Sequence, residues 1–396
     1  MSRSSTLSDV LSVPSQRGTS SKEFDLLCAC AGVELAPQRA ARIANWKKSE
    51  PEWNEFLRIA EHHGILALAA RNLSAHARGL PPEIEQGLRS AYEENIRRNL
   101  RFAGELVRIA EHFEKKKLRA IPYKGPALAA SVYGDLALRN FSDLDFLIAP
   151  ADFAAAKQAL AELGYRTSTE LRPEAERFWL RIGYECAFDG PAGRNLVELQ
   201  WRVLPHFYGV DLRIDDLLAR SGRTAVGGRE VPALAPEDLL LVLCLHAAKH
   251  LWMRLIWVCD IAEALRQPAD YTPVFARARS LGMTRILGVS FWLAENLLDA
   301  TLPQSAREVI AGDPKVPALG REFAARLARG ATYDLESPEY FRLILRLRER
   351  RRDRWRYLWR LALTPGAGDV AAVRLPEPLF PLYRVVRVLR LIKKLV

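Results

Sequence analysis

The amino-acid sequence predicts an α+β protein in which a small mixed sheet is framed by helical regions on both sides. Three stretches of the chain support this fold class. Apolar residues recur at helical spacing from Glu23 to Lys116, strand and helix patterns alternate between about residues 118 and 205, and a helical pattern runs from Pro236 to about Arg360. With 396 residues, 49% of them hydrophobic, the chain can form one large domain or two ordinary ones.

These patterns divide the chain into five regions. Residues 1–22 are rich in Ser and Thr and have no apolar run, which predicts a disordered leader and argues against a secretory signal. The other four regions are a helical region at 23–116, an α/β core at 117–210, a helical region at 211–362, and a Pro/Gly linker with a basic amphipathic tail at 363–396.

The α/β core has a readable order of elements. A short extended segment comes first, followed by a helix that Pro126 opens at its first turn. A strand begins at Asp143, and a helix closed by Gly164 comes after it. The segments 185–188 and 195–201 flank a turn-rich connector, which predicts a β-hairpin.

The strand that begins at Asp143 carries two carboxylates. Asp143 and Asp145 are two residues apart, so both side chains point to one face of a strand. Neighbouring anions are tolerated when a cation lies between them, and hard oxygen ligands suit Mg²⁺ or Mn²⁺ with phosphate oxygens completing the shell. Alternatively, the motif only begins a strand and is solvated. Phe146, Leu147 and Ile148 favour the first interpretation, because they place the acids at the edge of a packed sheet.

A third carboxylate comes from the predicted hairpin. Glu198 and Gln200 lie on one face of its second strand. If this strand pairs beside the first one, Glu198 reaches the two aspartates and a two-metal site results. The sequence therefore predicts Asp143, Asp145 and Glu198 as metal ligands and catalytic residues.

The motifs around the aspartate pair carry a resemblance. The chain resembles an uncharacterised, mostly bacterial nucleotidyltransferase family of the polymerase-beta superfamily in the ordered motifs Lys124-Gly125, Tyr133-Gly134, Arg139 and Ser142-Asp143-x-Asp145. It also resembles this family in His63-Gly64, in the stretch from Leu245 to Ala262 and in a closing Leu-Tyr-x-x-x-Arg segment, so the resemblance covers roughly residues 60 to 395.

The chain departs from the superfamily at two places. Lys124-Gly125 stands where the superfamily usually has Gly-Ser, although Lys-Gly is typical of the resembled family. In the third-acid strand the superfamily often has His between the acid and Trp201, and here that position is Gln200.

The resemblance implies a nucleotidyltransferase fold, Mg²⁺ and a nucleoside triphosphate donor, and it leaves the acceptor open. Asp143 and Asp145 would ligate the metal that bridges the triphosphate. Glu198 would hold a second metal and assist deprotonation of an acceptor hydroxyl, with pyrophosphate as the leaving group.

The nucleotide-binding residues implied by the resemblance surround these acids. Lys124, Gly125 and the N-terminus of the following helix would bind the triphosphate, together with Ser142. Arg139 could neutralise charge that develops in the transition state. Alternatively, Lys124 is a solvated loop lysine and Arg139 forms an ion pair with Asp143 or Asp135.

A second polar cluster is expected farther along the chain. On one continuous helix starting at His246, the residues Lys249, His250, Met253, Trp257 and Asp260 fall within about 60° of one direction. Lys249 and His250 would then line the nucleotide site, with Trp257 stacked on the base. Alternatively, His246 and His250 bind zinc, or Asp260 and Glu263 satisfy both histidines in a helix interface.

The net charge of +11 is concentrated near the C-terminus. Nine arginines and only Glu349 and Asp353 lie between Arg342 and Arg360, and five more cations without an acid follow from Leu382 onward. Arginines beside Trp355 and Trp359 could contact nucleic acid or an anionic membrane. Alternatively, these cationic helices pack on the protein by their apolar faces.

Cysteine usage and hydropathy bear on the location. Five scattered cysteines without paired spacings predict reduced thiols and a cytoplasmic location, with peripheral membrane contact as an addition. No stretch approaches the roughly 18 to 20 apolar residues of a membrane span.

Two functions remain. The first is an Mg²⁺-dependent enzyme that moves a nucleoside monophosphate onto a hydroxyl of a small molecule, a glycan precursor or a peptide. The second is a catalytically weak, nucleotide-sensing or membrane-docking scaffold. Because Asp143 and Asp145 are both present, the sequence favours the enzyme.

Overall fold

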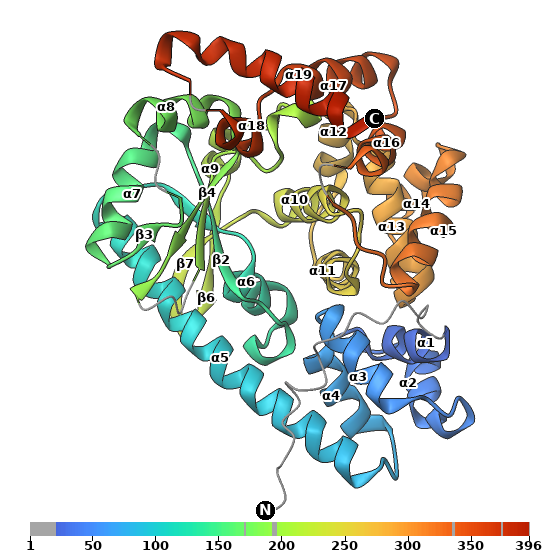
Figure 1. Cartoon of the computed structure of the whole chain (residues 1–396). Coiled ribbons are helices and arrows are strands. Elements are labelled where there is room, and N and C mark those ends of the chain that lie inside the picture. Colours follow the sequence, from blue (N-terminus) through green and yellow to red (C-terminus); the bar gives the residue numbers. More distant parts are fainter. Residues whose placement is uncertain (1–20, 170–171, 192–195, 335–336, 374, 396) are drawn as a thin grey trace, which may run out of the picture.

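The computed structural model describes residues 21–169, 172–191, 196–334, 337–373 and 375–395. A sheet lies on one side of the molecule and a group of helices lies on the other, with the N-terminal helices at the bottom and the C-terminal helices at the top (Figure 1). This arrangement confirms the predicted α+β fold class. Residues 1–20 of the expected leader lie outside the described residues, and Ser21 and Lys22 begin the first helix.

Five helices precede the sheet, as the helical spacing of residues 23–116 predicts: α1 (Ser21–Cys30), α2 (Pro37–Ala44), α3 (Trp53–His62), α4 (Leu66–His76) and α5 (Pro82–Lys115). The long α5 runs from the N-terminal helices along the sheet (Figure 1). Two of its buried side chains hold the segment that leads to the aspartate pair, because Asn95 donates to the carbonyl of Ala137 and Asn99 donates to that of Arg139.

The main sheet has the strand order β1-β2-β5-β4-β3. Its strands are β1 (Ala120–Pro122), β2 (Asp143–Ile148), β3 (Arg166–Thr167), β4 (Glu185–Asp189) and β5 (Leu196–Gln200). β4 and β5 pair antiparallel, which confirms the predicted hairpin, and β5 also pairs parallel with β2. The strands that carry Asp145 and Glu198 are therefore neighbours in the sheet, as expected.

The two faces of the sheet differ because residue types alternate along its central strands. Leu144, Phe146 and Leu199 point into a hydrophobic cluster shared with α5 and with α7 (Phe153–Glu162). The intervening positions of both strands carry the polar residues. Burial of one face therefore orients Asp145 and Glu198 toward the other.

Short elements connect the strands. β1 is followed by α6 (Gly125–Leu128) and a π-helical turn (Ala129–Tyr133), which match the helix expected at Pro126. α8 (Pro173–Ile182) precedes β4, and α9 (Ile214–Ala219) follows β5.

A second, two-stranded sheet occurs at the start of the stretch 211–362, which the sequence predicts as a helical region. β6 (Gly222–Val226) and β7 (Arg229–Ala233) form a hairpin within the region 211–362. Gly227 and Gly228 both have positive φ, as a tight two-residue hairpin turn requires. The helical prediction is therefore wrong for these residues.

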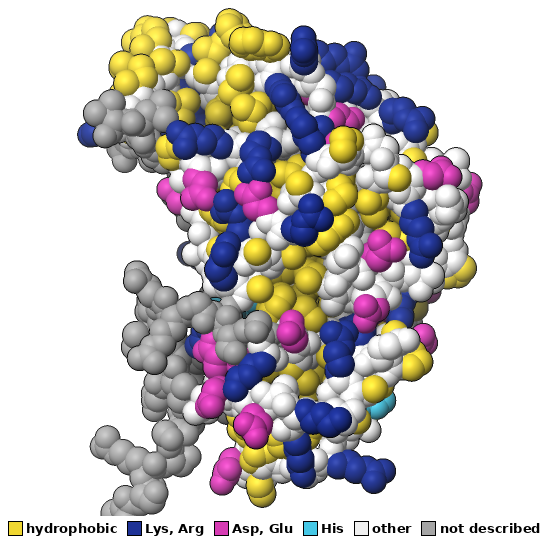
Figure 2. Space-filling model, turned by 90° about the vertical axis from the view of Figure 1, so that its right-hand side faces the viewer, with side chains coloured by type: hydrophobic (Ala, Val, Ile, Leu, Met, Phe, Trp, Pro, Cys, Tyr) yellow, Lys and Arg dark blue, Asp and Glu magenta, His cyan; other side chains and the backbone are white. Residues whose placement is uncertain are grey.

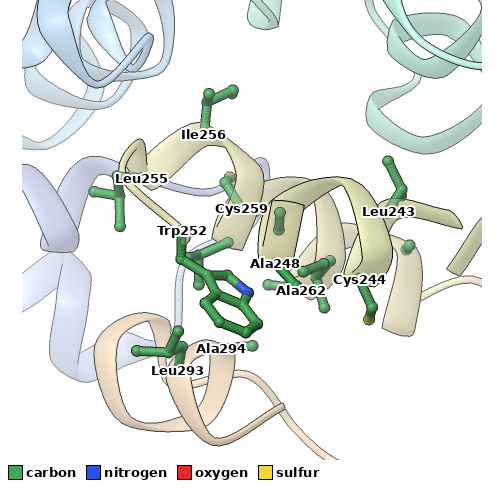
Figure 3. Close-up of a cluster of buried hydrophobic side chains, with 14 of the residues drawn as sticks. Leu243, Cys244, Ala248, Trp252, Leu255, Ile256, Cys259, Ala262, Leu293 and Ala294 are labelled. Carbon is green, nitrogen blue, oxygen red and sulfur yellow. The ribbon is translucent and has the colours of Figure 1, made fainter. Parts of the chain in front are cut away.

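The helical body after Pro236 consists of α10 (Pro236–Lys249), α11 (Leu255–Leu265), α12 (Thr272–Leu281), α13 (Thr284–Leu298), α14 (Gln304–Ala311) and α15 (Lys315–Ala328). The single helix expected through His246 and Asp260 is wrong, because the chain turns between α10 and α11. Leu251 and Trp252 have left-handed φ at this corner. The buried Trp252 indole packs beside Leu293 and Ala294 (Figure 3) and donates to Ser290 of α13.

The chain ends in α16 (Pro338–Leu347), α17 (Arg351–Leu363), α18 (Ala367–Ala372), a 3₁₀ segment (Glu377–Leu382) and α19 (Tyr383–Leu395). The expected linker and tail thus contain α18 and α19. Among the described helices, none combines the length and the apolar character that a membrane crossing needs.

Candidate active site

Three predicted carboxylates share the polar face of the sheet. Asp143 and Asp145 are two residues apart on β2, and Asp145 lies directly opposite Glu198 of the parallel strand β5. The Gln200 amide donates to Asp145 Oδ1 and to Glu198 Oε2, each over 2.9 Å. Its own oxygen accepts from the Tyr123 hydroxyl at 2.8 Å. Gln200 therefore links the acidic side chains.

A fourth carboxylate, Glu185, belongs to the same group and was not predicted. It lies opposite Gln200 in the β4–β5 hairpin, and its Oε2 is 3.3 Å from the Gln200 amide nitrogen. Side-chain alternation alone does not place Glu185 beside Glu198. The register of the hairpin is also needed, because the turn decides which residues of the two strands lie opposite each other.

Lys124 is the cation of this acidic face. Its Nζ lies 3.0 Å from Asp145 Oδ1, and the side chain is buried. Burial lowers the pKa of Lys124, but Asp145, Tyr123 and Asp143 together outweigh burial and raise that pKa. The alternative of a solvated loop lysine is therefore wrong.

Gly125 lets the loop after β1 approach β2. Its φ is +57°, and a Cβ at this position would lie 3.2 Å from the carbonyl oxygen of Asp143. Both features favour glycine. Ser142, which directly precedes β2, is exposed.

The four neighbouring carboxylates carry more negative charge than the nearby cations compensate. Burial raises the pKa of Asp143, Asp145, Glu185 and Glu198, and the neighbouring carboxylates add to this effect. Two buried ammonium groups, Lys124 and Lys249, face these four acids.

One atom of the acidic group is left without a partner. The buried Asp145 Oδ2 has no hydrogen-bond partner among the residues that the structure describes. An unpaired buried carboxylate oxygen and an excess of acids fit a divalent cation. In the described part of the chain, however, no three His, Cys, Asp or Glu side chains are arranged as a metal site. Lys124 and Gln200 lie among the carboxylates instead.

Arg139 forms a bidentate ion pair with Asp260 of α11. Its Nε and Nη2 donate to the two carboxylate oxygens over 2.8 and 2.9 Å, and the Tyr133 hydroxyl donates to the same carboxylate. The ion-pair alternative thus holds, but with a partner other than Asp143 or Asp135. Contact between Arg139 and the triphosphate stays a prediction.

Lys249, at the end of α10, points toward the acidic face. Its buried ammonium lies 4.9 Å from the centre of the Tyr184 ring, and burial lowers its pKa while Glu185 raises it. Within the described residues it has no ion pair shorter than 4 Å. The hydroxyls of Tyr208 and Tyr340 donate to its backbone carbonyl and so fix the end of the helix.

His246, His250 and Trp257 form an aromatic cluster beside Lys249. The ring centres of His250 and Trp257 are 4.9 Å apart at 32°, and those of the two histidines are 4.9 Å apart. Burial lowers the pKa of both histidines, and the nearby lysines lower it further.

The partners expected for these two histidines are placed elsewhere or lacking among the described residues. Asp260 is used by Arg139, and Glu263 accepts from the backbone of Val33, so neither acid is placed as the expected partner of the histidines. The zinc alternative lacks a third ligand in the described residues. Contact of His250 with a nucleotide stays a prediction.

His63 and Gly64 hold the start of α11. Leu255 donates its backbone N–H to His63 Nδ1 and Ile256 donates to the His63 carbonyl. Burial lowers the pKa of His63 to about 3. This pair therefore positions the helix that carries Asp260 and Trp257.

Comparison with known proteins gives a family match for this part of the chain. No curated protein gives a match. A family model described as an uncharacterised nucleotidyltransferase matches residues 49–299, which include the acidic strands, α10 and α11. The match ends before the C-terminal helices, so it is shorter than the resemblance seen by pattern. Because the match covers more than half of the chain, the protein belongs to this family of uncharacterised nucleotidyltransferases.

Proposed function

We propose that this protein transfers a nucleoside monophosphate from a nucleoside triphosphate to a hydroxyl acceptor and releases pyrophosphate. Asp143, Asp145 and Glu198 would hold Mg²⁺, or Mn²⁺ in its place. The observation that supports this proposal most is the shared face of β2 and β5. There Asp145 lies opposite Glu198 and keeps a buried oxygen that has no hydrogen-bond partner in the described part of the chain.

Bound Mg²⁺ would neutralise phosphate charge and stabilise the departing pyrophosphate. Lys124 would move from Asp145 to a phosphate oxygen once the charge of the acid is compensated. Lys249 would bind a second phosphate oxygen, because its ammonium faces the acids and forms no ion pair with any described residue. Ser142, exposed beside the start of β2, and Gly125 would complete the phosphate contacts.

The acceptor hydroxyl must lose a proton during transfer. Glu198 or Glu185 could accept it, because burial raises the pKa of both carboxyls toward the range of a general base. Glu185 lies on β4, one strand farther from the aspartates than Glu198 on β5. Glu185 would therefore lie on the side of the site where the acceptor binds. Small molecules, glycan precursors and peptides all offer such a hydroxyl.

We also propose a cytoplasmic location, because the five cysteines are free thiols and four of them are buried. A contact of the C-terminal tail with a membrane or nucleic acid would add to this activity without entering the site. The competing function is a catalytically weak nucleotide sensor or membrane-docking scaffold, which would bind a triphosphate without turning it over.

The test uses Asp143→Asn in the full chain, with Asp189→Asn as a matched control, since Asp189 is an exposed acid on β4. Each α-labelled triphosphate is incubated with Mg²⁺ and a cell extract, and label transfer is followed. We expect Asp143→Asn to fold normally and to lose at least about 100-fold in transfer rate.

Calorimetry separates the two functions. An unchanged Mg²⁺-dependent triphosphate affinity in Asp143→Asn would contradict the site. Triphosphate binding by the wild type without transfer to any acceptor would favour the scaffold.

A further inference from the structure

The last helix of the chain presents its apolar side outward. On α19, Val385, Leu389 and Ile392 are 54, 61 and 52% exposed and follow one another at helical spacing. The opposite side of the helix, which includes Tyr383 and Arg387, is buried. This orientation is the reverse of a tail that packs on the protein by its apolar face.

Ion pairs hold α19 in this orientation. Arg387 lies 3.6 Å from the buried Asp369 of α18 and donates to the carbonyl of Leu361 in α17. Arg390 pairs with the same aspartate. Because a buried carboxylate attracts two of the tail's arginines inward, the stripe of aliphatic side chains remains on the surface.

The tail is also fixed by aromatic packing on the sheet unit. The rings of Phe380 and Tyr383 contact Phe178 of α8, with ring centres 5.0 and 5.7 Å apart. The outward face of α19 is therefore preformed in the folded chain.

The neighbouring helix α17 adds to this surface. Its Tyr357 and Leu361 are buried, whereas Trp355 and Trp359 are 73 and 70% exposed. Leu358 is exposed as well. We call the six exposed side chains the C-terminal apolar face: Trp355, Leu358, Trp359, Val385, Leu389 and Ile392. Figure 2 shows hydrophobic side chains gathered at the top of the molecule, where α17 and α19 lie in Figure 1, close to Lys and Arg side chains.

We propose that the C-terminal apolar face docks on an anionic lipid bilayer. Tryptophan prefers the boundary between lipid headgroups and acyl chains, and the aliphatic side chains would enter that boundary. Arg351, Arg384 and Lys393 are exposed on the same two helices and form no ion pair with any described residue, so they would attract anionic headgroups.

Two other occupants fit this surface less well. Nucleic acid offers bases that stack on Trp355 and Trp359, but Val385, Leu389 and Ile392 cannot stack. A second copy of the chain, related by a two-fold axis, would bring the same cations of both copies into one interface, where they repel each other.

The experiment measures sedimentation of the full-length protein with phosphatidylcholine vesicles, with and without phosphatidylserine, at low and at high salt. We expect binding only to the vesicles with phosphatidylserine at low salt, and weaker binding at high salt because the attraction is screened. The double variant Trp355→Ser, Trp359→Ser should bind at least about tenfold more weakly. Leu100→Ser is the matched control, because Leu100 is an exposed apolar residue on α5.

Each outcome decides the proposal. Tryptophan emission of the wild type that is quenched by lipids brominated in the acyl chain, and is less quenched in the double variant, supports insertion of the face. No binding to anionic vesicles at low salt overturns the proposal. Light scattering that shows a dimer which the double variant loses, or RNA binding without vesicle binding, overturns it in favour of those partners.

Discussion

Gln200 is the residue on which the acidic face depends most directly. Its amide donates to Asp145 and Glu198, which are otherwise close enough to repel each other. A glutamine at this position supplies two amide hydrogens without taking up a proton. A neutral donor thus holds the acids together in the folded chain.

We expect Gln200→Leu to lower the free energy of unfolding by about 3 kcal/mol, because two hydrogen bonds to charged groups are lost. Urea unfolding measures this loss. Gln267→Leu is the control, since among the described residues its amide donates to one carbonyl, that of Val132, and it should cost about 1 kcal/mol. Equal losses in the two variants would show that Gln200 does not hold the acids.

At this scale the sequence predicts part of the site. The spacing of Asp143, Asp145 and Glu198 predicts their shared face, because side chains alternate along a strand. Glu185 and the partner of Arg139 could not be predicted. Glu185 depends on the hairpin register, and Asp260 lies on a helix whose start the sequence does not reveal.

The corner between α10 and α11 is the element that sequence patterns misplace. No Gly or Pro interrupts the helical pattern there, yet Leu251 and Trp252 adopt left-handed φ. Burial of Trp252 and its hydrogen bond to Ser290 outweigh local helix preference. The β6–β7 hairpin differs, because Gly227-Gly228 is a turn signal that the sequence does contain.

Buried histidines also lie at this corner. We therefore expect the folded chain to lose stability at acid pH. The pKa of His63 is lowered to about 3 by burial, so the unfolded chain binds a proton there that the folded chain does not. A lowered histidine pKa contributes stability at neutral pH that is lost as the pH falls below about 6.5.

We expect this histidine alone to cost about 2 kcal/mol between pH 7 and pH 5. Urea unfolding at both pH values checks it. The loss should be smaller by that amount in His63→Asn, which keeps an acceptor for Leu255, and unchanged in His76→Asn at an exposed site. Parallel curves for wild type and His63→Asn would refute the assignment.

Across the whole molecule, a buried ion pair is one of the links between the sheet unit and the helical body. The hydrophobic cluster of the helical body also includes Ile121 of β1 and Leu147 of β2, and a second cluster lies on the other face of the sheet. Arg139 belongs to the segment before β2 and Asp260 to α11, and both side chains are buried. The pair thus joins the segment before the strand of Asp145 to the helix that follows Lys249 in the chain.

We expect Asp260→Asn to cost about 3–5 kcal/mol, because it leaves the Arg139 charge buried without its acid. The triple variant Tyr133→Phe, Arg139→Met, Asp260→Leu removes every polar group of the cluster and should regain most of that stability. Urea unfolding and the transfer assay are both applied to it. If the triple variant is stable and active, Arg139 only positions the two parts of the chain. If it is stable but inactive, Arg139 contacts the triphosphate.

The same ion pair has a consequence for the order in which the protein is made. Arg139 and Asp260 are 121 residues apart, and at about 5–20 residues per second a ribosome needs on the order of ten seconds to pass from one to the other. During that interval Asp260 is not yet present to pair with the guanidinium. The acidic strands are therefore synthesised well before the helix that carries Asp260. A nascent chain that already contains Asp143, Asp145 and Glu198 cannot form the Arg139–Asp260 ion pair until α11 has emerged.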